Sequence, residues 1–130
     1  MAKIAAHIGK ELYKTEIKSA TNTIIADEPK EVGGNGLGFA PKELLASSLG
    51  ACTAITLRMY ADRKGWNLTD VKVEVEFNWD EENSKSVINR KIALFGTLDD
   101  TQRERLLKVA NGCPIHKILS NPIEITTILG

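Results

Sequence analysis

The chain has few of the residues that mark several common classes of protein. Its 130 residues include only two cysteines, and aromatic residues make up 5%, so Trp66 and Trp79 are expected to pack rather than to form a binding platform. Lysine and arginine total 17, as do aspartate and glutamate, and the basic residues are scattered. The electrostatic footprint of a nucleic-acid-binding protein is therefore missing.

Long apolar runs are also missing. No segment approaches the roughly 20 apolar residues that span a bilayer, and the first ten residues lack the apolar stretch of a signal peptide. We therefore expect a soluble, cytoplasmic protein with no membrane partner. A chain of this length suffices for one domain, which we expect to comprise residues 1–130. In a reducing compartment, two thiols favour a catalytic or redox-sensing role over a permanent crosslink.

The pattern of apolar residues predicts an α+β domain. Residues 3–27 are expected to form a small antiparallel meander, because isoleucines stand among polar and β-branched residues without a helical period. Residues 71–79 alternate between apolar and polar, and residues 86–97 follow as a partner strand after a polar turn. Helices at 41–64 and 99–111 would cover one face of such a sheet.

The helix at 41–64 has clear ends and one apolar stripe that we expect to be its buried face. Pro41 suits its first turn, and Gly65 suits the position after its last turn. Its apolar stripe is expected to contain Leu45, Leu49, Cys52, Ile55 or Thr56, and Met59. The small residues beside this stripe would permit a close approach by another helix. A terminal strand is suggested by Ile123, Ile125 and Ile128.

A loop rich in glycine, asparagine and proline covers residues 27–38. Such a loop can bind phosphate through its backbone N–H groups. Neither a Gly-Lys-Ser/Thr ending nor the G-x-G-x-x-G spacing occurs here. A plain connector is therefore expected.

The two cysteines differ in their local chemistry. Cys113 precedes Pro114, which suits the first position of a short helix through Leu119, so that Cys113 would be its N-cap. The free N–H groups at a helix start favour a thiolate, whereas burial on an apolar stripe disfavours the charged form of Cys52. Local chemistry thus ranks Cys113 as the more acidic thiol.

His116 follows Cys113 by three positions and admits several interpretations. It could stabilise a thiolate, or form a Cys/His nucleophile pair for acyl transfer. No third group that would orient the imidazole is identifiable, so a partly exposed helix residue is favoured. Cys-x-x-His supplies only two metal ligands, and no metal site is expected.

Three segments resemble the OsmC/Ohr family of osmotically inducible and organic-hydroperoxide-resistance proteins. They are Ala-Asp-Glu-Pro…Gly-Gly at 26–34, Pro41-Lys-Glu-Leu-Leu-Ala-Ser-Ser-Leu-Gly-Ala-Cys52 with its continuation to Gly65, and Cys113-Pro-Ile-His-Lys-Ile-Leu119. The resemblance implies an OsmC-like α+β fold, in which antiparallel sheets wrap central helices in an intertwined homodimer. The active sites would lie at the subunit interface.

The same resemblance implies a thiol-dependent peroxidase that needs no cofactor. Cys52 would attack an organic hydroperoxide and become a sulfenic acid, Cys113 would condense with it to a disulfide, and an external dithiol would reduce that disulfide. Family peroxidases add an N-terminal arginine and a glutamate directly after the helix-starting proline. Here no arginine precedes Arg58, and Glu43, one position later, is the candidate glutamate.

The alternative function is a non-catalytic binding module of the same fold. It would hold a small apolar or thiol-containing ligand in the cavity at the dimer interface. This alternative predicts that substitutions of the cysteines leave ligand binding largely intact.

Overall fold

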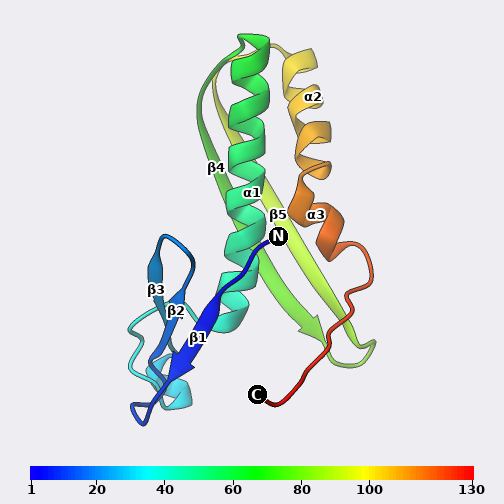
Figure 1. Ribbon diagram of the computed structural model, residues 1–130. Coiled ribbons are helices and arrows are strands. Elements are labelled where there is room, and N and C mark those ends of the chain that lie inside the picture. The colour runs from blue at the N-terminus through cyan, green and yellow to red at the C-terminus, as the bar shows by residue number, and fades with distance from the viewer. The chain divides into compact units, whose positions relative to one another are not determined.

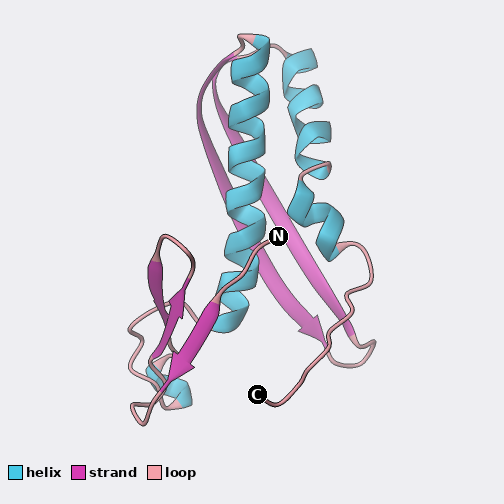
Figure 2. Cartoon of the chain, in the orientation of Figure 1, coloured by secondary structure: helices cyan, strands magenta, loops and turns pink.

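The computed structural model describes residues 1–130, which divide into two compact units, residues 1–45 and 46–130. Both sheets are antiparallel, and groups of strands and helices follow one another along the chain: three strands, a long helix, two strands and two further helices (Figure 2). The α+β class expected from the sequence is confirmed. That residues 1–130 act as one domain stays a prediction.

The first unit contains the expected meander. Strands β1 (Ala5–Ile8), β2 (Thr15–Lys18) and β3 (Thr23–Ala26) pair in chain order (Figure 1). A short 3-10 helix, η1 (Lys30–Val32), follows within the glycine-rich loop.

A buried carboxylate organises this loop. Asp27 is 3% exposed, and its oxygens accept hydrogen bonds from the backbone N–H groups of Tyr13 and Glu28 on one side and of Asn35 and Leu37 on the other, at 2.7–3.3 Å. Burial raises the pKa of the Asp27 carboxyl, but these four N–H groups outweigh it and hold the pKa below its ordinary value. The N–H groups that a bound phosphate would need are thus taken by the chain's own anion, as the connector interpretation requires.

Two glycines permit the close approach that this arrangement needs. A Cβ on Gly34 would lie 2.0 Å from the carbonyl oxygen of Glu28, and a Cβ on Gly38 would lie 1.9 Å from that of Ile25. Both distances are far shorter than a real contact, so a side chain at either position would force the backbone to move.

Helix α1 (Pro41–Lys64) begins in the first unit and continues into the second, with the bounds predicted from the sequence. Strands β4 (Asn67–Asp80) and β5 (Lys85–Thr97) then form the predicted hairpin, and α2 (Asp100–Asn111) and α3 (Pro114–Leu119) complete the chain's regular structure. In Figure 1, α1 and α2 run side by side along the hairpin.

The core of the second unit joins these elements. It contains five residues that are at most 3% exposed: Leu57 and Ala61 of α1, Leu68 of β4, and Leu106 and Ala110 of α2. Alanine at two of the five positions lets the helices approach closely, as the small residues of the sequence suggest.

The buried face of α1 differs from the predicted stripe. Its buried residues are Leu49, Thr53, Leu57 and Ala61, spaced by four positions. Leu45, Ile55 and Met59, which we expected inside, are 45–59% exposed. Because α1 carries apolar or small residues on every side, periodicity alone cannot choose its buried face.

Helix α1 also differs from the expectation that no segment could span a membrane. By length and composition it is apolar enough to do so. This is weak support for a membrane span, because core helices of water-soluble proteins pass the same test.

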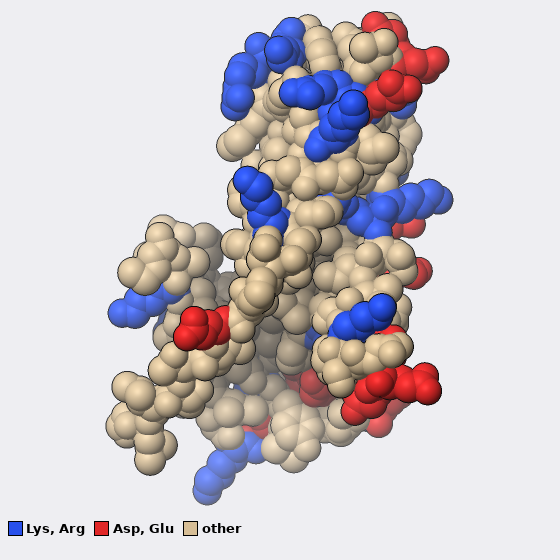
Figure 3. Space-filling model, turned by 90° about the vertical axis from the view of Figure 1, so that its right-hand side faces the viewer, with Lys and Arg blue, Asp and Glu red and all other residues tan.

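On the face drawn in Figure 3, basic and acidic side chains both occur, with much uncharged surface between them.

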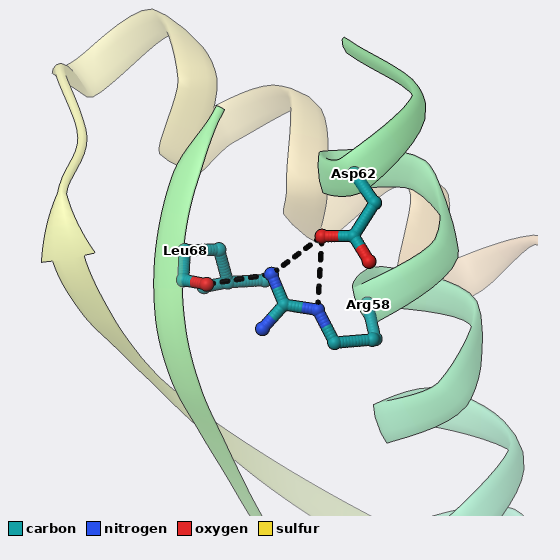
Figure 4. Close-up of polar contacts among 3 residues, drawn as sticks. All are labelled: Arg58, Asp62 and Leu68. Carbon is teal, nitrogen blue, oxygen red and sulfur yellow. Dashed lines mark hydrogen bonds and ion pairs between the residues drawn. The ribbon is translucent and has the colours of Figure 1, made fainter. Parts of the chain in front are cut away.

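An arginine joins the end of α1 to the start of β4. The guanidinium of Arg58 donates to the carboxylate of Asp62 at 2.9 and 3.2 Å and to the carbonyl oxygen of Leu68 at 2.6 Å (Figure 4). Gly65, with φ of +69°, makes the turn between the two elements, as predicted for a residue after a helix end. The charge of Arg58 is therefore already paired.

Residues 121–130 form no strand, which corrects the expectation for Ile123, Ile125 and Ile128. These isoleucines are 62–88% exposed. A strand exists only when a neighbouring sheet edge takes up its N–H and C=O groups. The alternating apolar pattern is present, but the single chain pairs no strand with it.

We predict that Asp27→Asn destabilises the fold at neutral pH, because an amide would turn an N–H group towards two backbone N–H groups. Thermal unfolding should show a midpoint lowered by several degrees. Since the folded-state pKa of Asp27 is lowered, its stabilisation is full above the ordinary pKa of 3.8 and is lost as the pH falls through the folded-state pKa. The difference between wild type and variant should therefore shrink in acid.

The matched control for this prediction is Glu31→Gln. Glu31 is exposed in the same loop, so its substitution removes the same charge without breaking the hydrogen bonds of Asp27. Equal midpoints for wild type and Asp27→Asn at neutral pH would contradict the role assigned to Asp27.

Candidate functional site

Cys113 occupies the predicted position before α3. It is the N-cap of this helix, with extended backbone angles, and Pro114 is the first helical residue. Its Sγ lies 3.4 Å from the backbone nitrogen of His116, whose N–H it accepts. The residue is fully buried. A sulfur held in this way is an acceptor, which favours its anionic form.

Cys52 comes from α1 and meets Cys113 directly. The two side chains are hydrogen-bonded, and both cysteines are free thiols in this structure. Cys52 is half-buried, whereas Cys113 is not accessible. The structure thus brings together the two thiols singled out in the sequence, although they lie in different helices.

A cation that sequence analysis missed lies beside this pair. Arg90 of β5 points its Nη1 at Thr53 Oγ1, 2.9 Å away, and at Cys113 Sγ, 4.0 Å away. Its Nη2 lies 2.9 Å from Asn111 Oδ1 and 3.0 Å from His116 Nδ1. The guanidinium therefore connects β5 to α1, α2 and α3.

One sequence signal could have revealed Arg90. It alternates with Ile88 and Ile92 along β5, and all three line the same cavity. A charged residue at an inward-facing strand position is costly unless it has partners. The partners themselves come from three other elements, so the sequence alone could not have named them.

The pKa of Cys113 results from opposing influences. Burial raises the pKa of its thiol, but the His116 N–H, the neighbouring Cys52 and the positive charge of Arg90 together lower it below the ordinary value. Thr53 lies beside the sulfur, but its single hydroxyl proton is directed to the Leu49 carbonyl oxygen at 2.7 Å and does not stabilise the thiolate.

His116 does not form a Cys/His nucleophile pair. Its Nδ1 faces the Arg90 guanidinium, which has only donors, so Nδ1 is an acceptor and the imidazole is neutral. Its link to Cys113 runs through the backbone N–H. A general base must be in hydrogen-bond reach of the proton that it removes, and the ring is turned to Arg90 instead.

Glu43, the other predicted catalytic residue, lies in the first turn of α1. Its carboxylate accepts a hydrogen bond from the backbone N–H of Ala40 at 2.8 Å. This contact satisfies one of the free N–H groups at the helix start. Its catalytic role stays a prediction.

A cavity of about 570 Å³ shares Arg90 and His116 with the surroundings of Cys113. Its lining is mixed: apolar side chains such as Leu49 and Leu107 alternate with polar ones, which include Arg90, Asn111 and His116. The volume is typical of a site for a small organic molecule. Neither cysteine lines this cavity, so Arg90 and His116 are the residues that connect it to the sulfurs.

The fold and the site together define a class of α+β proteins that carry a paired-thiol centre. A family model described as "OsmC-like protein" matches residues 33–128, which include both cysteines. The chain belongs to this OsmC-like family, and the resemblance seen in the sequence is confirmed. No curated protein matches the sequence.

Solved structures share the fold. An OsmC-like protein from Mycoplasma pneumoniae is 21% identical with a TM-score of 0.79, over 92% of this chain and 87% of that one. An organic hydroperoxide resistance protein from Legionella pneumophila is 24% identical, with a TM-score of 0.66, over 91% and 88%. The organic hydroperoxide resistance protein OhrB of Bacillus subtilis is 22% identical, with a TM-score of 0.62, over 91% and 89%.

We predict that Cys113 ionises below the ordinary pKa of a cysteine thiol, about 8.5. The Cys52→Ser variant leaves Cys113 as the only thiol and keeps a hydroxyl donor beside it. Its thiolate absorbance should rise at lower pH in the folded protein than in the same variant unfolded in guanidinium. A folded-state curve at or above the unfolded one would contradict the site geometry.

Proposed function

We propose that the protein is a thiol-dependent peroxidase that reduces organic hydroperoxides. The observation that carries the proposal is the contact between Cys52 and Cys113, one half-buried and one buried, with a cation beside the latter. A disulfide can close only between cysteines whose side chains meet. Structural neighbours whose names refer to hydroperoxide resistance support the substrate class.

The proposed reaction uses two electrons from the thiol pair. The Cys52 thiolate attacks one peroxide oxygen, the O–O bond breaks, and the alkoxide leaves with the electron pair and takes a proton to give the alcohol. The Cys113 thiolate then attacks the Cys52 sulfur, a disulfide forms, and the displaced hydroxide becomes water. An external dithiol reduces the disulfide and returns both thiols.

The order of the two cysteines agrees with their exposure and acidity. Cys52 is the more accessible and meets the peroxide, whereas the buried Cys113 reacts with the side chain of its hydrogen-bond partner Cys52. The lowered pKa of Cys113 also makes it the better leaving thiol when the disulfide is reduced. The lowered pKa of Cys113 therefore suits both the closing of the disulfide and its reduction.

We predict that Cys52→Ser loses peroxide turnover by at least about a hundredfold, because the attacking sulfur is gone. Cys113→Ser should stop at the Cys52 sulfenic acid, which dimedone would trap and mass spectrometry would detect. Turnover of cumene hydroperoxide with a dithiol donor is the measurement. Full activity in either variant would contradict the proposed mechanism.

A binding module of the same fold is the second candidate, favoured by a cavity of about 570 Å³ that offers both apolar and polar side chains. It would hold a small apolar ligand without any change at sulfur. The two functions separate in the double variant Cys52→Ser, Cys113→Ser. The binding module would be favoured if this variant bound the ligand as tightly as wild type does and if wild type consumed no hydroperoxide.

We further propose that the protein acts as a cytoplasmic homodimer, with Glu43 contributing to the site as the resemblance implies. Support for the assembly comes from the exposed apolar face of α1, which includes Ile55 and Met59, and from the exposed isoleucines of residues 121–130. Such an area of apolar side chains is unusual on a monomer and typical of an interface.

We predict that the wild-type chain has twice its sequence mass in solution by light scattering. Ile55→Glu should give a folded single chain, because it places a charge on the exposed apolar face of α1 without touching the core. Lys64→Glu, exposed at the end of the same helix, is the matched control and should stay dimeric. A wild type of single-chain mass would exclude the dimer.

A further inference from the structure

Arg90 has no carboxylate partner. The ion pairs of the structure are Lys18 with Glu16 and Arg58 with Asp62. The groups that receive the Arg90 N–H bonds are the hydroxyl of Thr53, the amide oxygen of Asn111 and the ring nitrogen of His116, all of them neutral. A partly buried cation that is held only by neutral acceptors keeps its charge uncompensated.

The one group beside this cation that can become an anion is the sulfur of Cys113. Arg90 Nη1 is 4.0 Å from Cys113 Sγ, and the guanidinium stays protonated at any working pH. Removing the proton of Cys113 would place a negative charge next to an unpaired positive one inside a largely buried site. The attraction between them is much stronger there than in water.

We propose that Arg90 is the catalytic cation of the thiol pair, which holds Cys113 as the thiolate that closes the disulfide. This inference rests on the proposed peroxidase function and assigns a residue to its second step. Arg90 supplies charge and exchanges no proton. In the closing step, the Cys113 sulfur gives its electron pair to the Cys52 sulfur, the S–O bond breaks, and hydroxide leaves and is protonated to water.

Thr53, Asn111 and His116 are positioning residues in this proposal. Thr53 accepts from Nη1, and Asn111 and His116 both accept from Nη2, so that the plane of the guanidinium is fixed and Nη1 also faces the sulfur. The Thr53 hydroxyl donates to the Leu49 carbonyl oxygen and therefore turns a lone pair to Arg90. Lysine at position 90 would keep the charge, but its single nitrogen with three N–H groups could not serve the three acceptors and also face the sulfur.

The proposal assigns Arg90 to the second chemical step, and this gives it a specific signature. Without the cation, Cys52 can still be oxidised, but fewer Cys113 sulfurs are ionised and the disulfide closes slowly. The sulfenic acid of Cys52 should then accumulate. A residue that merely stabilised the fold would not change the ratio of sulfenic acid to disulfide.

The experiment compares wild type, Arg90→Gln, Arg90→Lys and the control Arg63→Gln. Arg63 is exposed in the last turn of α1, so its substitution removes the same charge 11 positions from Cys52, about 16 Å along the helix. Each full-length protein receives one equivalent of cumene hydroperoxide. Dimedone-labelled sulfenic acid and disulfide are then followed by mass spectrometry.

Arg90→Gln should close the disulfide about tenfold more slowly or worse, with labelled sulfenic acid in excess. Arg90→Lys should lie between it and wild type, and Arg63→Gln should equal wild type. In a Cys52→Ser background, Arg90→Gln should also shift the thiolate titration of Cys113 to higher pH. Circular dichroism checks that each variant is folded, and Arg90→Lys carries the test if Arg90→Gln is not.

Two outcomes would overturn different parts of the argument. Disulfide closure and Cys113 titration that are the same in wild type and in the folded Arg90 variants would overturn the role of Arg90 and leave the peroxidase function standing. A wild type that forms neither sulfenic acid nor disulfide with the peroxide would overturn the proposed function itself.

Discussion

The guanidinium of Arg90 is the interaction on which the organisation of the second unit's site depends. It reaches from β5 to Thr53 on α1, to Asn111 at the end of α2, and to Cys113 and His116 at the start of α3. Four elements that are distant in sequence are thereby fixed around one charge. Because its hydrogen-bonded acceptors are neutral, that charge remains available to a sulfur anion.

Two of the arginines that join elements in this unit, Arg58 and Arg90, differ in the partners of their charge. Arg58 meets the carboxylate of Asp62 and a carbonyl oxygen, so its charge is neutralised and its effect is to tie α1 to β4. Arg90 has a similar number of bonds but no anion among them. The difference lies in the partners, and neither arginine's own position in the sequence reveals it.

Much of the fold was predictable because the residues that begin and end its helices act through local backbone constraints. Pro41 and Gly65 mark the ends of α1, and Pro114 makes Cys113 an N-cap, each through a constraint on one or two backbone angles. The alternation of residues 71–79 likewise needs only the geometry of a strand, and the structure extends it to Asn67–Asp80. Such signals do not depend on what the rest of the chain does.

The features that could not be predicted from the sequence depend on residues that are distant along the chain. The buried face of α1 follows Leu49, Thr53 and Leu57, because β5 and α2 lie there, while the equally apolar Ile55 and Met59 stay exposed. The role of Arg90 depends on acceptors from three helices. Cys52 and Cys113 could be paired in advance only through the family resemblance, since nothing in their spacing brings two helices together.

The internal carboxylate of the glycine-rich loop has a consequence for the first unit as a whole. In anion-binding loops, successive backbone N–H groups form a concavity around a bound anion. Here the carboxylate of Asp27 belongs to the same chain as the N–H groups that it binds, so its binding is intramolecular and does not depend on the concentration of a free anion. The loop that leads into α1 is therefore held in shape by a side chain of its own and requires no bound anion.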